Sequence, residues 1–162
     1  LAQVNGDTYL RFDNQYPADS EVWNSADIDV SGSSTVTVSF DARSQGGMEV
    51  TGPAQDKFEV YAVLDGVEEA IPFVSVMGHV DGTGDGSAYN VDASFSEAIA
   101  TGGAQTLGIR VKVLISANNG SESYLINNVV ATAPLLEDQT LTTDAGLCSA
   151  VATWDNPVVW DN

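Results

Sequence analysis

The sequence predicts an all-β protein: an antiparallel β-sandwich of the jelly-roll type with a short β extension at its C-terminal end. Three observations carry this prediction. Segments rich in Val, Ile, Thr and aromatic residues alternate apolar with polar positions, clusters of Gly, Asn, Asp and Ser separate them, and helical periodicity is nearly absent. Short alternating segments between regularly spaced turn signals are typical of two packed antiparallel sheets.

The strand at 34–43 has the clearest alternation. Val36, Val38 and Phe40 point to one side, while the Thr and Ser residues between them point to water. Similar segments follow along the chain. Strands are expected at 8–13, 21–30, 34–43, 57–64, 69–79, 87–97, 105–116 and 123–132, and two shorter ones at 139–143 and 150–154.

Two turns and two outward-facing sets follow from the same pattern. Asp65-Gly66 is a hairpin signal, because both positions of such a turn need a positive φ. Alternation within 57–64 leaves Lys57 and Tyr61 on an outer face. Alternation within 105–116 puts Arg110 and Lys112 on an outer face as well. The second turn is expected at 117–121.

The charge of the chain is strongly one-sided. It has 23 acidic and 5 basic residues, a net charge of -18 at pH 7. Such a surface repels nucleic acids and anionic membranes, so neither is expected as a partner. No run of about 18 apolar residues occurs, so no membrane insertion is expected either. The acidity suits multivalent cations or a salty environment; simple solubility is the alternative.

The residues do not predict an enzyme. The chain has one histidine, His79, and one cysteine, Cys148, and no Ser-His-Asp set can be assigned. A carboxylate pair for glycoside hydrolysis stays open as an alternative, since so many acids always offer pairs. His79 ends an expected strand and precedes a Gly-Asp loop, so it is expected at a loop rim.

Calcium is the expected metal, because it takes six to eight hard oxygen ligands. The loop 80–87 places Asp81 and Asp85 among three glycines, with a flexible turn as the alternative. A second candidate site joins the first strand to the last one, since such strands are often neighbours in a sandwich. Its candidate ligands are Asp7 or Asp13 together with Glu122 and Asn127.

Carbohydrate binding would use exposed aromatic rings, against which sugars stack. The candidates are Tyr16, Tyr61 and Tyr89, whereas Trp23 is expected in the core. Tyr61 shares its outward face with three basic residues, and such a face could accept an anionic or sulfated glycan. Neutralisation of Glu59 and its neighbours is the alternative. The basic residues of this face are Lys57, Arg110 and Lys112.

Residues 133–162 resemble the start of hyalin repeats, which are immunoglobulin-like modules of extracellular proteins. The resemblance rests on Asp144-Ala-Gly146-Leu-Cys148, Ala150-Val151, Trp154, Pro157 and Asp161-Asn162. It divides the chain into a sandwich at 1–132 and a truncated repeat at 133–162. It also implies a secreted or cell-surface location, a polypeptide that continues, and a partner for Cys148 in that continuation.

The sandwich itself is similar to secreted jelly-roll domains of the carbohydrate-binding-module type. The matching pieces are Val22-Trp23, Asp56-Lys57-Phe58-Glu59-Val60-Tyr61, Leu107-Gly-Ile-Arg110-Val and Glu122-Ser-Tyr124-Leu-Ile126-Asn127-Asn128-Val129. Such domains are non-catalytic modules of large secreted proteins. Asn127 stands where the pattern has Asp, which would weaken any calcium site that uses this position.

The expected function is that of a non-catalytic extracellular adhesion or surface-ligand-binding module in a multidomain protein. Its partner would be a glycan or a cell-surface protein. One alternative is a carbohydrate-binding module that targets a polysaccharide-degrading enzyme. Another is a filament subunit that associates with copies of itself through its C-terminal strands, since the segment 149–154 could add to a neighbouring sheet edge.

Overall fold

Strands make up all the regular secondary structure of the computed structural model, which describes residues 2–4, 7–13, 21–52, 55–87, 89–115 and 122–134. Because this part of the chain contains no helix, it contains none that could cross a membrane. The strands are β1 (Ala2–Val4), β2 (Asp7–Asp13), β3 (Glu21–Asn24), β4 (Ile28–Asp29), β5 (Thr35–Gly46), β6 (Lys57–Leu64), β7 (Val67–Glu68), β8 (Val74–Met77), β9 (Tyr89–Ala100), β10 (Thr106–Leu114) and β11 (Ser123–Thr132).

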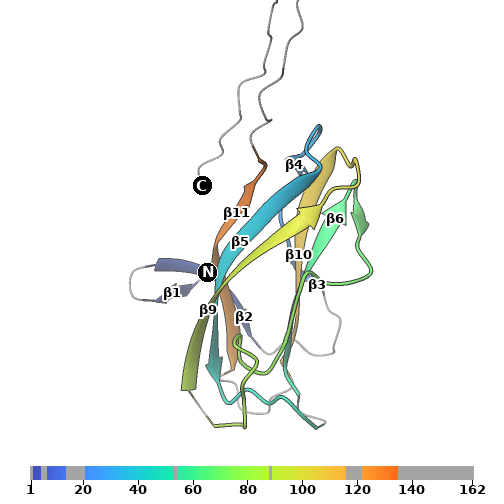
Figure 1. Ribbon diagram of the computed structural model, residues 1–162. Coiled ribbons are helices and arrows are strands. Elements are labelled where there is room, and N and C mark those ends of the chain that lie inside the picture. Colours follow the sequence, from blue (N-terminus) through green and yellow to red (C-terminus); the bar gives the residue numbers. More distant parts are fainter. Residues whose placement is uncertain are drawn as a thin grey trace, which may run out of the picture.

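The strands form two antiparallel sheets, which pack as a sandwich (Figure 1). The first sheet has the order β1-β2-β11-β5-β9. The second has the order β3-β10-β6-β7, with β4 on β10 and β8 on β6. Strands β2-β11-β5-β9 thus oppose β3-β10-β6-β8, which is the strand order of a jelly roll. The predicted fold class is confirmed, and so is the expectation that the first and last strands of the sandwich are neighbours.

Aromatic rings from both sheets fill the core. Val36, Val38 and Phe40 of β5 are buried, as their alternation predicts. The ring of Phe58, from the opposite sheet, lies 6.2 Å from that of Phe40 and 5.4 Å from that of Tyr124 in β11. Full burial of one such side chain stabilises the fold by roughly 1.5 to 3 kcal/mol, so these contacts hold the two sheets together.

The hairpin between β6 and β7 turns at Asp65-Gly66, as predicted. Asp65 has φ 49° and Gly66 has φ 78°, the left-handed conformation that this turn requires. The Asp65 carboxylate accepts hydrogen bonds from the backbone N–H groups of Gln105 and Thr106, at 2.8 and 2.9 Å. The same residue therefore makes the turn and anchors the start of β10.

Two expected strands are wrong in extent, each for a local reason. The strand expected at 21–30 is broken because the Ser25 hydroxyl accepts the N–H of Ile109 at 2.8 Å, in place of a backbone carbonyl. The strand expected at 69–79 shrinks to β8, because the chain bends at 70–73 before it pairs with β6 again at Val74. Strand β9 is longer than expected, and β1 was not predicted. The expected strands at 139–143 and 150–154 lie outside the described residues.

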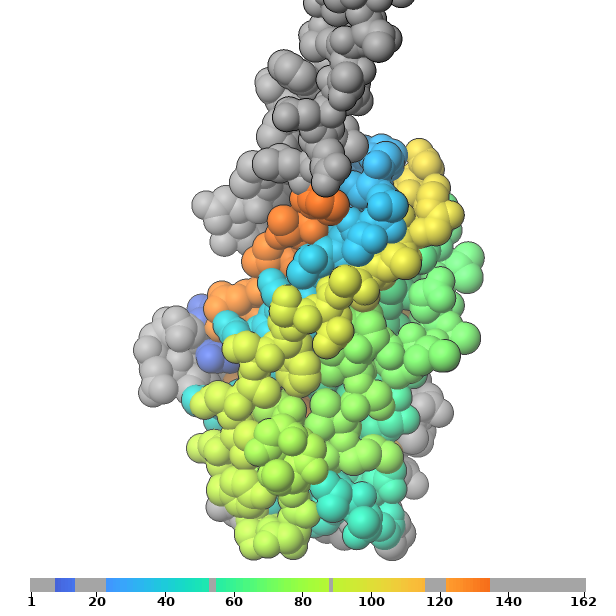
Figure 2. Space-filling model, in the orientation of Figure 1, coloured from blue at the N-terminus to red at the C-terminus, as the bar shows by residue number. Residues whose placement is uncertain are grey.

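One side of the sandwich is bounded by two free strand edges. Strand β9 ends the first sheet, and β7 and β8 both lie on the outer edge of β6 in the second. The surfaces of residues 65–87 and of β9 lie side by side there, in green and yellow-green in Figure 2. Because no further strand of the described chain closes this side, the sandwich is open along it.

Candidate metal centre

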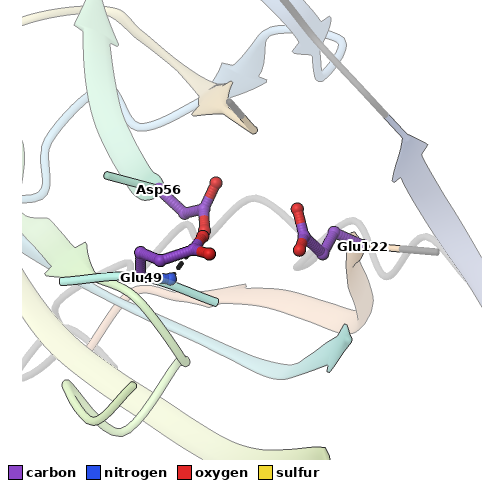
Figure 3. A group of neighbouring side chains, drawn as sticks. All are labelled: Glu49, Asp56 and Glu122. Carbon is purple, nitrogen blue, oxygen red and sulfur yellow. Dashed lines mark hydrogen bonds between the residues drawn. The ribbon is translucent and has the colours of Figure 1, made fainter. Parts of the chain in front are cut away.

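Three carboxylates meet at one end of the sandwich, near the β5–β6 loop. The Glu49 N–H donates to Asp56 Oδ2 and the Asp56 N–H donates to the Glu49 carbonyl, both at 2.8 Å. These two bonds close the loop and put its two carboxyl groups together. Glu122, immediately before β11, completes the group. One oxygen from each residue lies within 4.8 Å of the others, and the side chains face one another in Figure 3.

The cluster is buried, and part of it has no hydrogen-bond partner. Asp56 and Glu122 are 0% and 1% exposed, and Glu49 is half-buried. The Oε2 atoms of Glu49 and Glu122 are both buried without a partner. Leaving a buried oxygen unpaired costs about 1 to 3 kcal/mol, and more when it is charged. Figure 3 shows the Glu122 carboxylate directed at the other two.

The surroundings favour protonated over charged carboxyl groups when no cation is bound. Burial raises the pKa of Glu49 to about 7, helped by a hydrogen bond to Asp56 and by the charges of Asp56 and Glu122. Burial also raises the pKa of Glu122, as does the charge of Asp56, while an N–H from Gly47 opposes this rise. The site therefore attracts either protons or a cation.

Close backbone packing shapes the site. A Cβ on Gly47 would lie 2.5 Å from the Gly86 carbonyl oxygen, so a side chain at this position would push the two loops apart. The Gly86 N–H donates to the Met48 carbonyl at 3.2 Å, and Glu49 bridges to Asp85 through the backbone. The 80–87 loop thus packs across the segment that carries Glu49.

Asp81 and Asp85, predicted as metal ligands, lie in this neighbouring loop and make local bonds. The Asp81 carboxylate accepts from the N–H and hydroxyl of Thr83, at 2.9 and 2.6 Å. The Asp85 carboxylate accepts from the Ser87 N–H at 2.8 Å. The structure does not bring these two side chains together with the buried cluster.

Of the second predicted ligand set, only Glu122 belongs to the cluster. Asp13 lies opposite Ser123 of β11, but its carboxylate pairs with Arg11 at 2.7 Å. Asn127 lies opposite Asp41, and its buried Oδ1 has no hydrogen-bond partner. Asp7 pairs with Val4 of β1 in backbone register, and its side chain lies outside the described residues.

Sequence reasoning missed Glu49 and Asp56 as ligands. They lie seven positions apart in a loop that is rich in glycine at 46–52. The available signal was two acids in one glycine-rich connection between strands. Their pairing with Glu122 depends on how the β5–β6 loop closes, which alternation does not reveal.

The predicted ligand face on the second sheet does assemble, but its charges are paired. Arg110 lies opposite Tyr61, and the Lys112 ammonium lies 4.6 Å from the centre of the Tyr61 ring. Glu68 accepts from Arg110 at 2.9 Å and from Lys112 at 2.7 Å. Lys57 pairs at 2.8 Å with Glu59, which is buried instead of facing water. This geometry favours local neutralisation over an anionic glycan site.

The prediction that His79 lies at a loop rim is wrong. The side chain is 0% exposed, and its Nδ1 lies 2.8 Å from the Ser44 hydroxyl oxygen. That oxygen also accepts the Val80 N–H at 3.1 Å, while the buried Nε2 atom has no hydrogen-bond partner among the described residues. Burial lowers the pKa of His79, which keeps the ring neutral.

Tyr89 is the exposed aromatic residue nearest to this region. Its ring packs against that of His79, with 4.1 Å between centres and 35° between the ring planes, and 40% of the residue is exposed. Its hydroxyl lies 3.3 Å from that of Thr83. Trp23 is half-buried against the core, and Tyr16 lies outside the described residues.

Comparison with known proteins adds no relative to this description: no protein-family model matches the chain, and neither does any curated protein.

Proposed function

We propose that this chain is a non-catalytic, calcium-binding β-sandwich module that works outside the cell and binds a surface ligand. One observation carries the proposal. The Glu122 carboxylate is buried, has an unpaired oxygen and faces two further carboxylates, Glu49 and Asp56. A bound cation would balance this charge and supply a partner for the unpaired oxygens.

The donor set supports calcium among the common metals. All three side chains offer hard carboxylate oxygens, whereas zinc sites generally use nitrogen and sulfur donors as well. Magnesium demands near-ideal octahedral geometry, while calcium tolerates irregular sites such as one built on loops. Calcium sites of extracellular modules bind in the range of about 10⁻⁴ to 10⁻³ M. Without a metal, the cluster binds protons near neutral pH, and calcium has to displace them. This competition suits a weak affinity for calcium, as in extracellular modules, and therefore an extracellular setting.

A binding role is supported more strongly than a catalytic one. His79, the single histidine of the chain, is buried and has its Nδ1 bonded to Ser44. Of the three clustered acids, Asp56 and Glu122 are buried, so the cluster does not present an exposed pair of carboxylates to a sugar. Association through the C-terminal strands stays a prediction, because those residues lie outside the described part.

Calcium should raise the melting temperature of the protein. A ligand that binds only the folded state at a hundred times its dissociation constant contributes about 2.7 kcal/mol, which for a domain of this size is about 5 to 10 °C. The measurement is calorimetric melting after chelation, with calcium or magnesium then added at equal concentration. The matching isothermal titration should give one site per chain. No shift on adding calcium back to chelated protein would remove the calcium proposal.

Tyr89 supports a second candidate function, carbohydrate binding. The Tyr89 ring is exposed and packs against His79, and the Tyr89 hydroxyl lies next to that of Thr83. Sites in which sugars stack on an aromatic ring have polar groups beside the ring in the same way. Tyr89→Ala should reduce retention on a bound polysaccharide by roughly tenfold, a loss of about 1.4 kcal/mol. Tyr61→Ala is the matched control on the other predicted face. Loss in Tyr61→Ala alone would move the site to the second sheet, and retention by both variants would exclude both rings.

A further inference from the structure

An open groove runs between the two free strand edges, β8 and β9. It has a volume of about 410 Å³ and lies where the two sheets come apart. Its two walls belong to different sheets and lie side by side on the face shown in Figure 2. The groove is lined by Val50, Ser75, Val76, Met77, Val80, Asp81, Gly82 and Phe95.

Apolar side chains line part of the groove and are incompletely covered. Phe95 stacks on the core residue Phe40, with 5.0 Å between ring centres, but it remains half-buried because β9 has no neighbour beyond it. Val76 is also half-buried, and Met77 is 36% exposed. A partner that covers these side chains would gain the apolar burial that the sandwich leaves unused.

Carboxylates flank this apolar surface. Asp81 lines the groove. Phe95 and Glu97 lie opposite Phe40 and Val38 in the β5–β9 register, so Glu97 points to the same side of β9 as Phe95. A charged residue on the core-facing side of a strand would ordinarily be buried at high cost, yet Glu97 is exposed because the sandwich is open here.

No basic residue balances these acids. The five Lys and Arg residues of the chain stand at positions 11, 43, 57, 110 and 112. Lys57 lies opposite Met77 of β8, but its ammonium pairs with Glu59. Arg43 does reach β9, but it pairs with Asp92, whose side chain points to the opposite side of the strand from Glu97. No ion pair among the described residues involves Glu97 or Asp81.

The outer edge of β9 adds backbone groups to this surface. The strand pairs along all twelve of its residues with β5, and no described strand pairs with its other side. A free edge presents unpaired N–H and C=O groups to an incoming extended chain. Added strands of this kind obtain affinity from main-chain hydrogen bonds and specificity from alternate side chains, which here would enter the groove.

We propose that the surface formed by Met77, Asp81, Phe95, Glu97 and the edge of β9, the open flank, docks an extended cationic segment of a partner protein. Apolar side chains of that segment occupy the groove, and Lys or Arg side chains reach Asp81 and Glu97. The opposite charge of the partner follows from the two unbalanced carboxylates. The inference names the partner of the ligand-binding module proposed above and does not depend on the calcium site.

The test uses the complete chain and two fluorescent hexapeptides, Val-Thr-Lys-Thr-Val-Thr (the Lys peptide) and the same sequence with Glu in place of Lys (the Glu peptide). This spacing puts Val and Lys on one side of an added strand, as Phe95 and Glu97 are on one side of β9. Anisotropy should show saturable binding of the Lys peptide, weakened by added salt, and no binding of the Glu peptide. Glu97→Gln and Met77→Glu should each weaken binding about tenfold or more. Asp29→Asn is the control, because it removes one carboxylate from β4, on the other edge of the second sheet. Hydrogen exchange of β9 amides should slow in the complex.

Equal affinity of the Lys peptide for wild type, Glu97→Gln and Asp29→Asn would overturn the proposal. The peptide would then be attracted by the net negative charge of the protein and not by the open flank. Absence of peptide binding would overturn it too, as would binding without protection of β9. Binding of a neutral hexasaccharide in place of the peptide would favour the second candidate function instead. Melting curves with calcium on the same samples separate the two claims: a calcium shift without peptide binding overturns only the docking, and the reverse overturns only the calcium site.

Discussion

Glu122→Gln is expected to stabilise the calcium-free protein and to abolish its response to calcium. Glutamine has nearly the shape of glutamate, so the packing around a residue that is 1% exposed is kept. The substitution removes one of three negative charges that face each other in a buried site. Its amide group can also donate a hydrogen bond to Glu49 or Asp56, where the native oxygen has no partner.

The size of the effect follows from the cost of buried charge. Uncompensated burial of an ionised group costs several kcal/mol, and partial protonation of the cluster relieves part of it at neutral pH. We therefore expect a gain of about 1 to 2 kcal/mol, or roughly 2 to 8 °C in melting temperature, for the calcium-free variant. At the same time, adding calcium should no longer raise the melting temperature of the variant, because one of the three protein carboxylate ligands is lost.

Calorimetric melting of wild type and variant in chelator and in calcium measures both effects. Glu69→Gln is the control, since Glu69 is exposed and its substitution changes the net charge by the same amount. The control should keep the full calcium shift. If Glu122→Gln also kept it, calcium would bind elsewhere. A strongly destabilised variant would show that the native carboxylate makes a contact that the cluster geometry does not account for.

Alternation predicted the framework of the sandwich well, for a physical reason. In β5 and β10 the inward residues from Val36 to Ser44 and from Leu107 to Val113 are buried by the facing sheet, so the pattern along these strands records the two sides directly. Strand β9 was predicted less completely, because it is an edge strand at the open side. Its inner positions are half-buried or, at Glu97, exposed, and the contrast between its two faces is weak.

For the candidate site, the sequence predicted the kind of cation and one of the three ligands, but not which residues come together. Net acidity pointed to a hard cation, and Glu122 was among the expected ligands. Glu49 and Asp56 were missed because their carboxylates meet through two backbone hydrogen bonds that close a loop, an event without periodicity. His79 was misplaced for a related reason. A polar residue next to a Gly-Asp loop is expected to be exposed. Here, however, the loop folds back and its backbone packs against residues 47–49.

The second large effect concerns pH. Burial and the neighbouring acids raise the pKa of Glu49 from 4.5 to about 7 in the folded protein. A group with a raised folded pKa contributes stability that is fully present below its unfolded pKa, here near 4.5, and is lost as the pH rises through the folded pKa. The calcium-free protein should therefore lose stability at this residue between about pH 5 and pH 8.

The contribution of His79 to stability has the opposite pH dependence, so the experiment must separate it from the contribution of Glu49. Its pKa is lowered by burial, so its contribution is lost as the pH falls below about 6.5. Comparison of wild type with Glu49→Gln cancels this effect, because both proteins keep His79. Chemical unfolding in chelator at pH 5, 6, 7 and 8 is the measurement. Relative to the variant, wild type should lose on the order of 2 kcal/mol over this range, since one pKa unit corresponds to about 1.4 kcal/mol and partial exposure of Glu49 reduces the effect.

Calcium should reverse this trend, because cation and proton compete for the same carboxylates. Deprotonated ligands are required for metal binding, so the affinity for calcium should rise from pH 5 to pH 8 and binding should release protons. Titration calorimetry in two buffers of different ionisation enthalpy measures that release directly. Calcium affinity that is independent of pH would place the ion away from Glu49, whose proton is the one that calcium must displace. A stability difference between wild type and Glu49→Gln that stays constant from pH 5 to pH 8 would show that this carboxyl group titrates normally and that the cluster carries no stored repulsion for calcium to relieve.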